Sequence, residues 1–111
     1  MTKCLLLLPT NYNNGQPVES AKLDNCLGRL DSLIGGHTVD GTCEGVYRMA
    51  DGTYARDTNL KVWACVEEKE IPALRKLVGV FAVELGQESI YLEHTATTVE
   101  FVSGNQSGKA A

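Results

Sequence analysis

The chain has 111 residues, of which 43% are hydrophobic and 22% charged, with a formal net charge of −4 and a pI of about 5.1. This length favours a single domain, and the acidic balance disfavours nucleic acid as a partner, because phosphate binding requires a basic patch. No apolar segment approaches the roughly 20 residues of a membrane span, and the leucines after Lys3 are too few for a secretory signal, so we expect no membrane partner and a cytoplasmic location.

The four cysteines predict small core residues rather than a metal or redox site. They are Cys4, Cys26, Cys43 and Cys65. No pair has the close C-x-x-C spacing of zinc or redox motifs, and each lies in an apolar stretch. We therefore expect no metal and no cofactor.

The first third of the chain predicts a buried strand, a loop and a helix. Cys4–Leu8 is a continuous apolar run that ends at a proline, and Asn11–Pro17 is rich in turn-forming residues. Ser20 is placed to cap a helix that Gly35-Gly36 ends. The apolar residues of this helix recur at intervals of three or four: Leu23, Cys26, Leu27, Leu30, Leu33 and Ile34.

The middle of the chain predicts a β-hairpin. Two β-patterned runs, Thr42–Met49 and Leu60–Val66, flank the turn signal Asp51-Gly52. In the second run one set of side chains suits a core beneath helices: Leu60, Val62, Ala64 and Val66. The alternating set, which includes Trp63, is too apolar for a face left in water.

The last third predicts a second helix and a final strand. Pro72 suits the first turn of a helix that Gly86 ends. Its apolar stripe would be Ile71, Leu74, Leu77, Val78, Phe81 and Leu85. We expect a strand over Ser89–Glu93, a further β-rich piece over Thr98–Val102, and a disordered tail over 103–111.

This order predicts one α+β domain over residues 1–102 with the ferredoxin-like β-α-β-β-α-β arrangement, in which two helices cover one face of an antiparallel sheet. The opposite face would carry Trp63, Cys65 and Tyr91. An uncovered apolar face of that size is unusual in a monomer, and the simplest cover is another copy of the chain. We therefore expect a homo-oligomer with its site at a subunit interface.

Candidate site residues are few, because the sequence lacks a phosphate-binding glycine loop, a nucleophile elbow and a histidine pair. His37 and His94 read as loop histidines. Strand alternation places Glu93 on the same open face as Trp63, where a carboxylate must be paired, protonated or matched by a bound cation. An intersubunit salt bridge from Glu93 to Lys61 or Arg48 is the plainer alternative.

Several stretches resemble the bacteriophage S-adenosylmethionine lyases, a family once called hydrolases. They are Gly45-Val46-Tyr47-Arg48, Asp57 with Lys61-Val62-Trp63-Ala64-Cys65, Ala73–Glu84, Gln87–Tyr91 and His94-Thr95-Ala96, within residues 40–102. The resemblance implies a ferredoxin-like, PII-like homotrimer with S-adenosylmethionine bound between subunits in the host cytoplasm. It also implies an anti-restriction role through depletion of the host methyl donor.

The resemblance assigns roles to individual residues. Tyr47 matches a family active-site tyrosine, and Asp57 matches an active-site acidic position at which the family more often has glutamate. Gln87 matches a family glutamine of possible structural role, whereas Glu93 is added from strand geometry. Taken singly, Tyr47 reads as a half-buried strand tyrosine and Asp57 as a strand-end residue.

In the lyase reaction that the resemblance implies, the substrate's own carboxylate attacks its γ-carbon and expels 5′-methylthioadenosine, which leaves homoserine lactone. Charges cancel as the bond forms, so a desolvated cleft that holds the chain folded suffices without a protein nucleophile. Asp57 and Glu93 would bind the cationic groups, and Tyr47 would position the substrate. A hydrolase is the less expected reaction, and a non-catalytic PII-like trimer that binds a nucleotide-type molecule or a protein is the alternative function.

Overall fold

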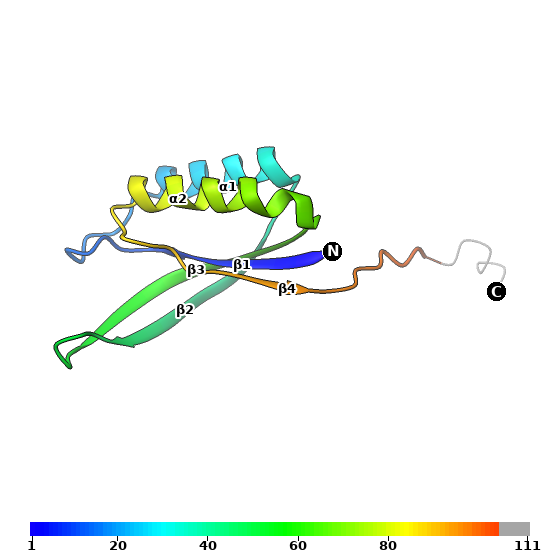
Figure 1. Ribbon diagram of the computed structural model, residues 1–111. Helices are drawn as coiled ribbons and strands as arrows, with labels where there is room; N and C mark the ends of the chain where they lie inside the picture. The colour runs from blue at the N-terminus through cyan, green and yellow to red at the C-terminus, as the bar shows by residue number, and fades with distance from the viewer. Residues whose placement is uncertain (105–111) are drawn as a thin grey trace.

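A computed structural model describes residues 1–104 of the chain and has one four-stranded antiparallel sheet with two helices on one face (Figure 1). The elements are β1 (Thr2–Pro9), α1 (Ser20–Ile34), β2 (Thr38–Arg48), β3 (Tyr54–Val66), the short 3-10 helix η1 (Glu68–Glu70), α2 (Ile71–Glu84) and β4 (Leu92–Ala96). The strand order is β2-β3-β1-β4. The predicted ferredoxin-like α+β fold is therefore confirmed.

The core lies between the sheet and the helices. In β1 every second side chain is buried, namely Cys4, Leu6 and Leu8, and β3 contributes Val62 and Val66 by the same alternation. The helices complete the core with Cys26, Leu30, Ile71, Leu74, Val78 and Phe81, and Val18 before α1 and Leu85 after α2 join them. Both predicted helix stripes thus face the sheet, although Leu33 remains 37% exposed.

Several predicted boundaries differ from the structure. Ser20 is the first residue of α1 and not its cap; Glu19 precedes the helix and makes no side-chain cap bond. The hairpin strands are longer than predicted. Met49 donates its N–H to Thr53 C=O at 2.7 Å and closes a tight turn, so β3 begins at Tyr54. At the other end β2 begins at Thr38, because Thr38 and Val39 pair with Trp63 and Val62.

The end of the chain was predicted less well. β4 covers Leu92–Ala96 rather than Ser89–Glu93, since the chain leaving α2 first reaches β1 in register where Leu92 faces Leu6. His94 therefore lies in a strand and not in a loop. Residues 98–102 form no strand, and of the predicted disordered tail, residues 105–111 lie outside the described part. No helix among residues 1–104 is long and apolar enough to cross a membrane.

Substitution by alanine is expected to change the stability in opposite directions at Gly28, inside α1, and at Gly35, directly after it. Gly35 caps the helix with φ of 86°, a left-handed conformation that costs other residues about 1–2 kcal/mol. Gly28 lies inside the helix with open space around its Cα. We expect Gly35→Ala to lower the free energy of unfolding by that amount and Gly28→Ala to raise it by about 0.5–1 kcal/mol. Urea titration of both variants checks this, and equal effects of the same sign would contradict it.

Candidate functional site

The sheet face opposite the helices carries a row of side chains that the strand register brings together. Leu5 of β1 faces Trp63 on one side and Glu93 on the other, so these three residues are neighbours on this open face. The Lys3 ammonium lies 4.5 Å from the centroid of the Trp63 ring. The register confirms the prediction that Glu93 lies on the same face as Trp63, with Leu5 between them.

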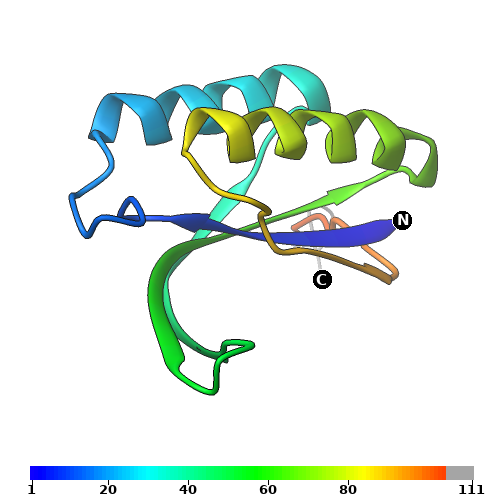
Figure 2. The same cartoon turned by 60° about the vertical axis from the view of Figure 1, so that its left-hand side comes forward.

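Beyond the end of β1, strands β2 and β3 continue alone as a two-stranded arm formed by residues 44–48 and 54–58. Figure 2 shows the arm curving away from the helices. The pairing of β2 with β3 is irregular between Val39 and Thr42, and Gly41 there has φ of 76°. Such bulges bend and twist a strand, which accounts for the curvature. The bend turns the inner side of the arm toward the open face.

A groove of about 860 Å³ lies where the arm leaves the sheet. Its walls come from the arm, from the β1–α1 loop and from the segment that leads into β4. Three of the four predicted site residues line it, namely Tyr47, Asp57 and Gln87. Residues distant in sequence therefore meet in one groove where the arm, the β1–α1 loop and the segment before β4 come together.

Tyr47 and Asp57 are placed by the pairing within the arm. Gly45 is directly opposite Asp57, and the Tyr47 side chain folds back along its own strand over Gly45. A Cβ on residue 45 would lie only 2.6 Å from the Tyr47 hydroxyl. Glycine at this position thus leaves room for the Tyr47 phenol to lie toward Asp57, a requirement that sequence reasoning missed.

Glu93 does not line the groove itself but is linked to it through Tyr91, which does. The Tyr91 hydroxyl donates a hydrogen bond of 2.9 Å to Glu93 Oε1. This bond and the negative charge of Glu93 raise the pKa of Tyr91, with smaller contributions from burial and from the Tyr47 phenol. Within one chain, over residues 1–104, no ion pair involves Glu93, and the Lys61 ammonium lies 3.6 Å from the Asp40 carboxylate. A salt bridge from Glu93 to Lys61 or Arg48 of another subunit stays a prediction.

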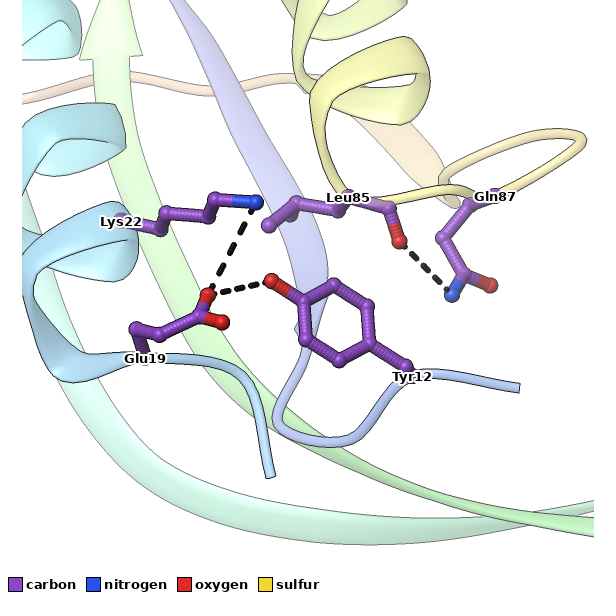
Figure 3. Close-up of polar contacts among 5 residues, drawn as sticks. All are labelled: Tyr12, Glu19, Lys22, Leu85 and Gln87. Atoms are coloured by element: carbon purple, nitrogen blue, oxygen red, sulfur yellow. Dashed lines mark hydrogen bonds and ion pairs between the residues drawn. The ribbon is translucent and has the colours of Figure 1, made fainter. Parts of the chain in front are cut away.

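The wall opposite the arm contains Tyr12, which the sequence analysis treated only as part of a loop. Figure 3 shows the Tyr12 hydroxyl directed at the Glu19 carboxylate, to which it donates a hydrogen bond. The same figure shows Gln87, whose side-chain amide donates to Leu85 C=O at 3.3 Å. This hydrogen bond holds the turn after α2, which forms part of the groove wall, so Gln87 contributes to the shape of the groove.

Two other features of the described chain bear on the choice of site. A hollow of about 480 Å³ between the outer sides of α1 and α2 is lined by Arg29, Leu33 and Val80 among others, and none of the predicted site residues lies there. Within residues 1–104, no three histidine, cysteine or acidic side chains gather in a way that could hold a metal ion.

The comparison with known proteins rests on structure alone. No family model matches the sequence, and no curated protein matches it. Among solved structures, a phage SAM lyase in complex with S-methyl-5′-thioadenosine aligns with a TM-score of 0.64 at 10% identity, covering 85% of this chain and 79% of the other. A phage SAM lyase in the apo state also aligns with a TM-score of 0.64 at 10% identity, covering 85% of this chain and 78% of the other.

A second kind of neighbour is the divalent cation tolerance protein CutA1 from Thermus thermophilus. It aligns with a TM-score of 0.63 at 13% identity and covers 99% of this chain and 93% of the other. At such identities the likeness concerns the fold. This chain therefore has the ferredoxin-like fold found in phage SAM lyase and in CutA1, and the resemblance noted in its sequence extends to the whole architecture.

Proposed function

We propose that this protein is an S-adenosylmethionine lyase, which converts its substrate into 5′-methylthioadenosine and L-homoserine lactone. The observation that carries the proposal is the groove, which gathers Tyr47, Asp57 and Gln87 from separate elements and places Tyr91 with its Glu93 partner at the edge. The likeness to a phage lyase solved with S-methyl-5′-thioadenosine supports a ligand of this type.

The reaction requires the protein to position the substrate and to match its charges. The substrate carries a sulfonium and an ammonium, and its carboxylate must reach its own γ-carbon in line with the departing sulfur. Carboxylates of Asp57 and Glu93 suit the cationic groups, while the Tyr47 phenol restrains the folded substrate chain. A low-dielectric groove favours the transition state, in which opposite charges are neutralised, over the separated charges of the bound substrate.

The proposal includes a homotrimer whose subunits cover one another's open faces. In the single chain both sides of the arm are exposed: on one side Val46 is 50% exposed, and on the other Tyr47 is 44% exposed. A two-stranded ribbon alone is marginally stable in water, and the apolar row around Trp63 also lacks a cover. Assembly through this face would order the arm that carries Tyr47 and Asp57, and would exclude water from the groove.

The test is to incubate purified protein with S-adenosylmethionine and to follow both products by chromatography and proton NMR. We expect methylthioadenosine and homoserine lactone to form together, with homoserine appearing later by lactone hydrolysis. Homoserine formed without a lactone intermediate would identify a hydrolase. No consumption of substrate by folded, assembled protein would overturn the proposed activity.

A non-catalytic, PII-like binding trimer is the second candidate, and one observation favours it. CutA1 covers 99% of this chain, against 85% for the phage lyase. In that case a nucleotide-type ligand would bind in the same groove without being consumed, so calorimetry run beside the turnover assay separates the two functions.

A further inference from the structure

We infer that the β1–α1 loop, and Tyr12 above all, is the part of the groove that recognises the nucleoside half of the ligand. This inference rests on the proposed function and goes beyond it, because it assigns a specificity-determining residue that neither the sequence patterns nor the resemblance indicated. Tyr12, Asn11, Asn13 and Gly15 of this loop line the groove.

The β1–α1 loop is held in one conformation by hydrogen bonds within it and by a contact with the turn after α2. Its ends are joined by a β-bridge between Asn11 and Pro17. Inside it, Tyr12 N–H donates to Gln16 C=O at 2.8 Å, and Gly15 N–H donates to Tyr12 C=O at 2.9 Å. The Asn13 side chain donates to Gly86 C=O at 3.2 Å and so ties the loop to the turn after α2. A wall fixed in this way presents its side chains at little entropic cost on binding.

The Tyr12 ring is itself held in place before any ligand arrives. Its hydroxyl donates to Glu19, and the Lys22 ammonium lies 5.3 Å from the ring centroid and 3.7 Å from the Glu19 carboxylate (Figure 3). The hydrogen bond from Tyr12 lowers the pKa of Glu19. The ionised form of Glu19 is therefore favoured, and it is the form that accepts the hydrogen bond from the phenol. The ring is half-buried and therefore offers a fixed aromatic surface in the groove.

The charges around the groove favour one orientation of a ligand that is cationic at one end and aromatic at the other. On the arm the groove presents the Asp57 carboxylate and Arg56, whose guanidinium lies 3.4 Å from the Glu44 carboxylate, whereas the loop wall presents only aromatic, amide and glycine groups. A purine is neutral, and it gains from stacking on an aromatic ring roughly 1–3 kcal/mol per base. The sulfonium and ammonium therefore belong near Asp57 and Glu93, and the adenine belongs against Tyr12.

Calorimetric titration of methylthioadenosine into variants of the full chain tests this assignment. We expect Tyr12→Leu to weaken binding of methylthioadenosine roughly tenfold, and Tyr12→Phe, which keeps the ring, to stay within about threefold of the wild type. Phe101→Leu is the control, because it removes an aromatic ring that is 95% exposed and does not line the groove. Unchanged affinity in folded Tyr12→Leu would overturn the inference.

A second measurement does not depend on the leucine variant folding. Tyr12 ring protons, assigned by comparison with Tyr12→Phe, should move upfield in the NMR spectrum of the wild type when methylthioadenosine is added, because a stacked purine shields them. Binding without such a shift would overturn the assignment of Tyr12 while leaving the proposed lyase intact. Wild-type protein that neither binds methylthioadenosine nor consumes S-adenosylmethionine would overturn both.

Discussion

Removal of the negative charge from Asp57 or Glu93 is expected to lower kcat/KM for S-adenosylmethionine on the order of 100-fold in at least one of the variants Asp57→Asn and Glu93→Gln. Both substitutions keep the size of the side chain, so the lost quantity is the electrostatic attraction for the sulfonium and ammonium. Glu93→Gln also retains a carbonyl oxygen that can accept the Tyr91 hydrogen bond, which separates the charge of Glu93 from its contact with Tyr91.

Turnover of the two variants is compared with that of Asp24→Asn, which makes the same change at an exposed position of α1 outside the groove. Circular dichroism and sedimentation should show wild-type fold and assembly in all three. If Asp57→Asn and Glu93→Gln both keep wild-type kcat/KM, the proposed catalytic residues are wrong, even where the protein itself consumes the substrate.

The second large effect is expected from a charge placed in the open face. Trp63→Asp should dissociate the oligomer into folded monomers and abolish turnover, because a buried aromatic contact at an interface is commonly worth at least about 2 kcal/mol and an unpaired carboxylate there adds a desolvation penalty. The fold itself should survive, since Trp63 lies on the face opposite the core. Sedimentation velocity measures the mass, and circular dichroism measures the fold.

Val83→Asp serves as the control for this experiment. Val83 is 80% exposed on α2, on the helical side of the molecule, so the same apolar-to-acidic change should leave mass and turnover as in the wild type. A wild-type protein that sediments as a monomer, or a Trp63→Asp variant of unchanged mass, would contradict assembly through the open face.

The sequence was sufficient to predict the fold because its signals are local and periodic. The stripe from Ile71 to Leu85 repeats every three or four residues, and the alternation in β3 repeats every two, so each element and its buried side follow from the chain alone. The same alternation in the last strand placed Glu93 on the open face, even though the strand was predicted too early in the chain.

The boundaries were harder because they depend on partners distant in sequence. A strand extends as far as another strand offers hydrogen bonds, which is why β3 begins at Tyr54 and β4 begins at Leu92. The Asp51-Gly52 turn marks where the hairpin reverses, but no local signal marks how far its ladder extends or where β4 begins. The same holds for Ser20, whose residue type suits a cap although the chain places Glu19 before the first helical turn.

By itself, the sequence determined the class of fold, the apolar character of the open face and the choice of Tyr47, Asp57, Gln87 and Glu93 as candidates. Only the tertiary structure brought Tyr47, Asp57 and Gln87 into one groove, set Gly45 beneath the Tyr47 phenol and added Tyr12 to the opposite wall. Periodicity tells which side of an element a residue occupies, whereas the meeting of a bent arm, a loop and a strand end depends on twist and register across the whole sheet.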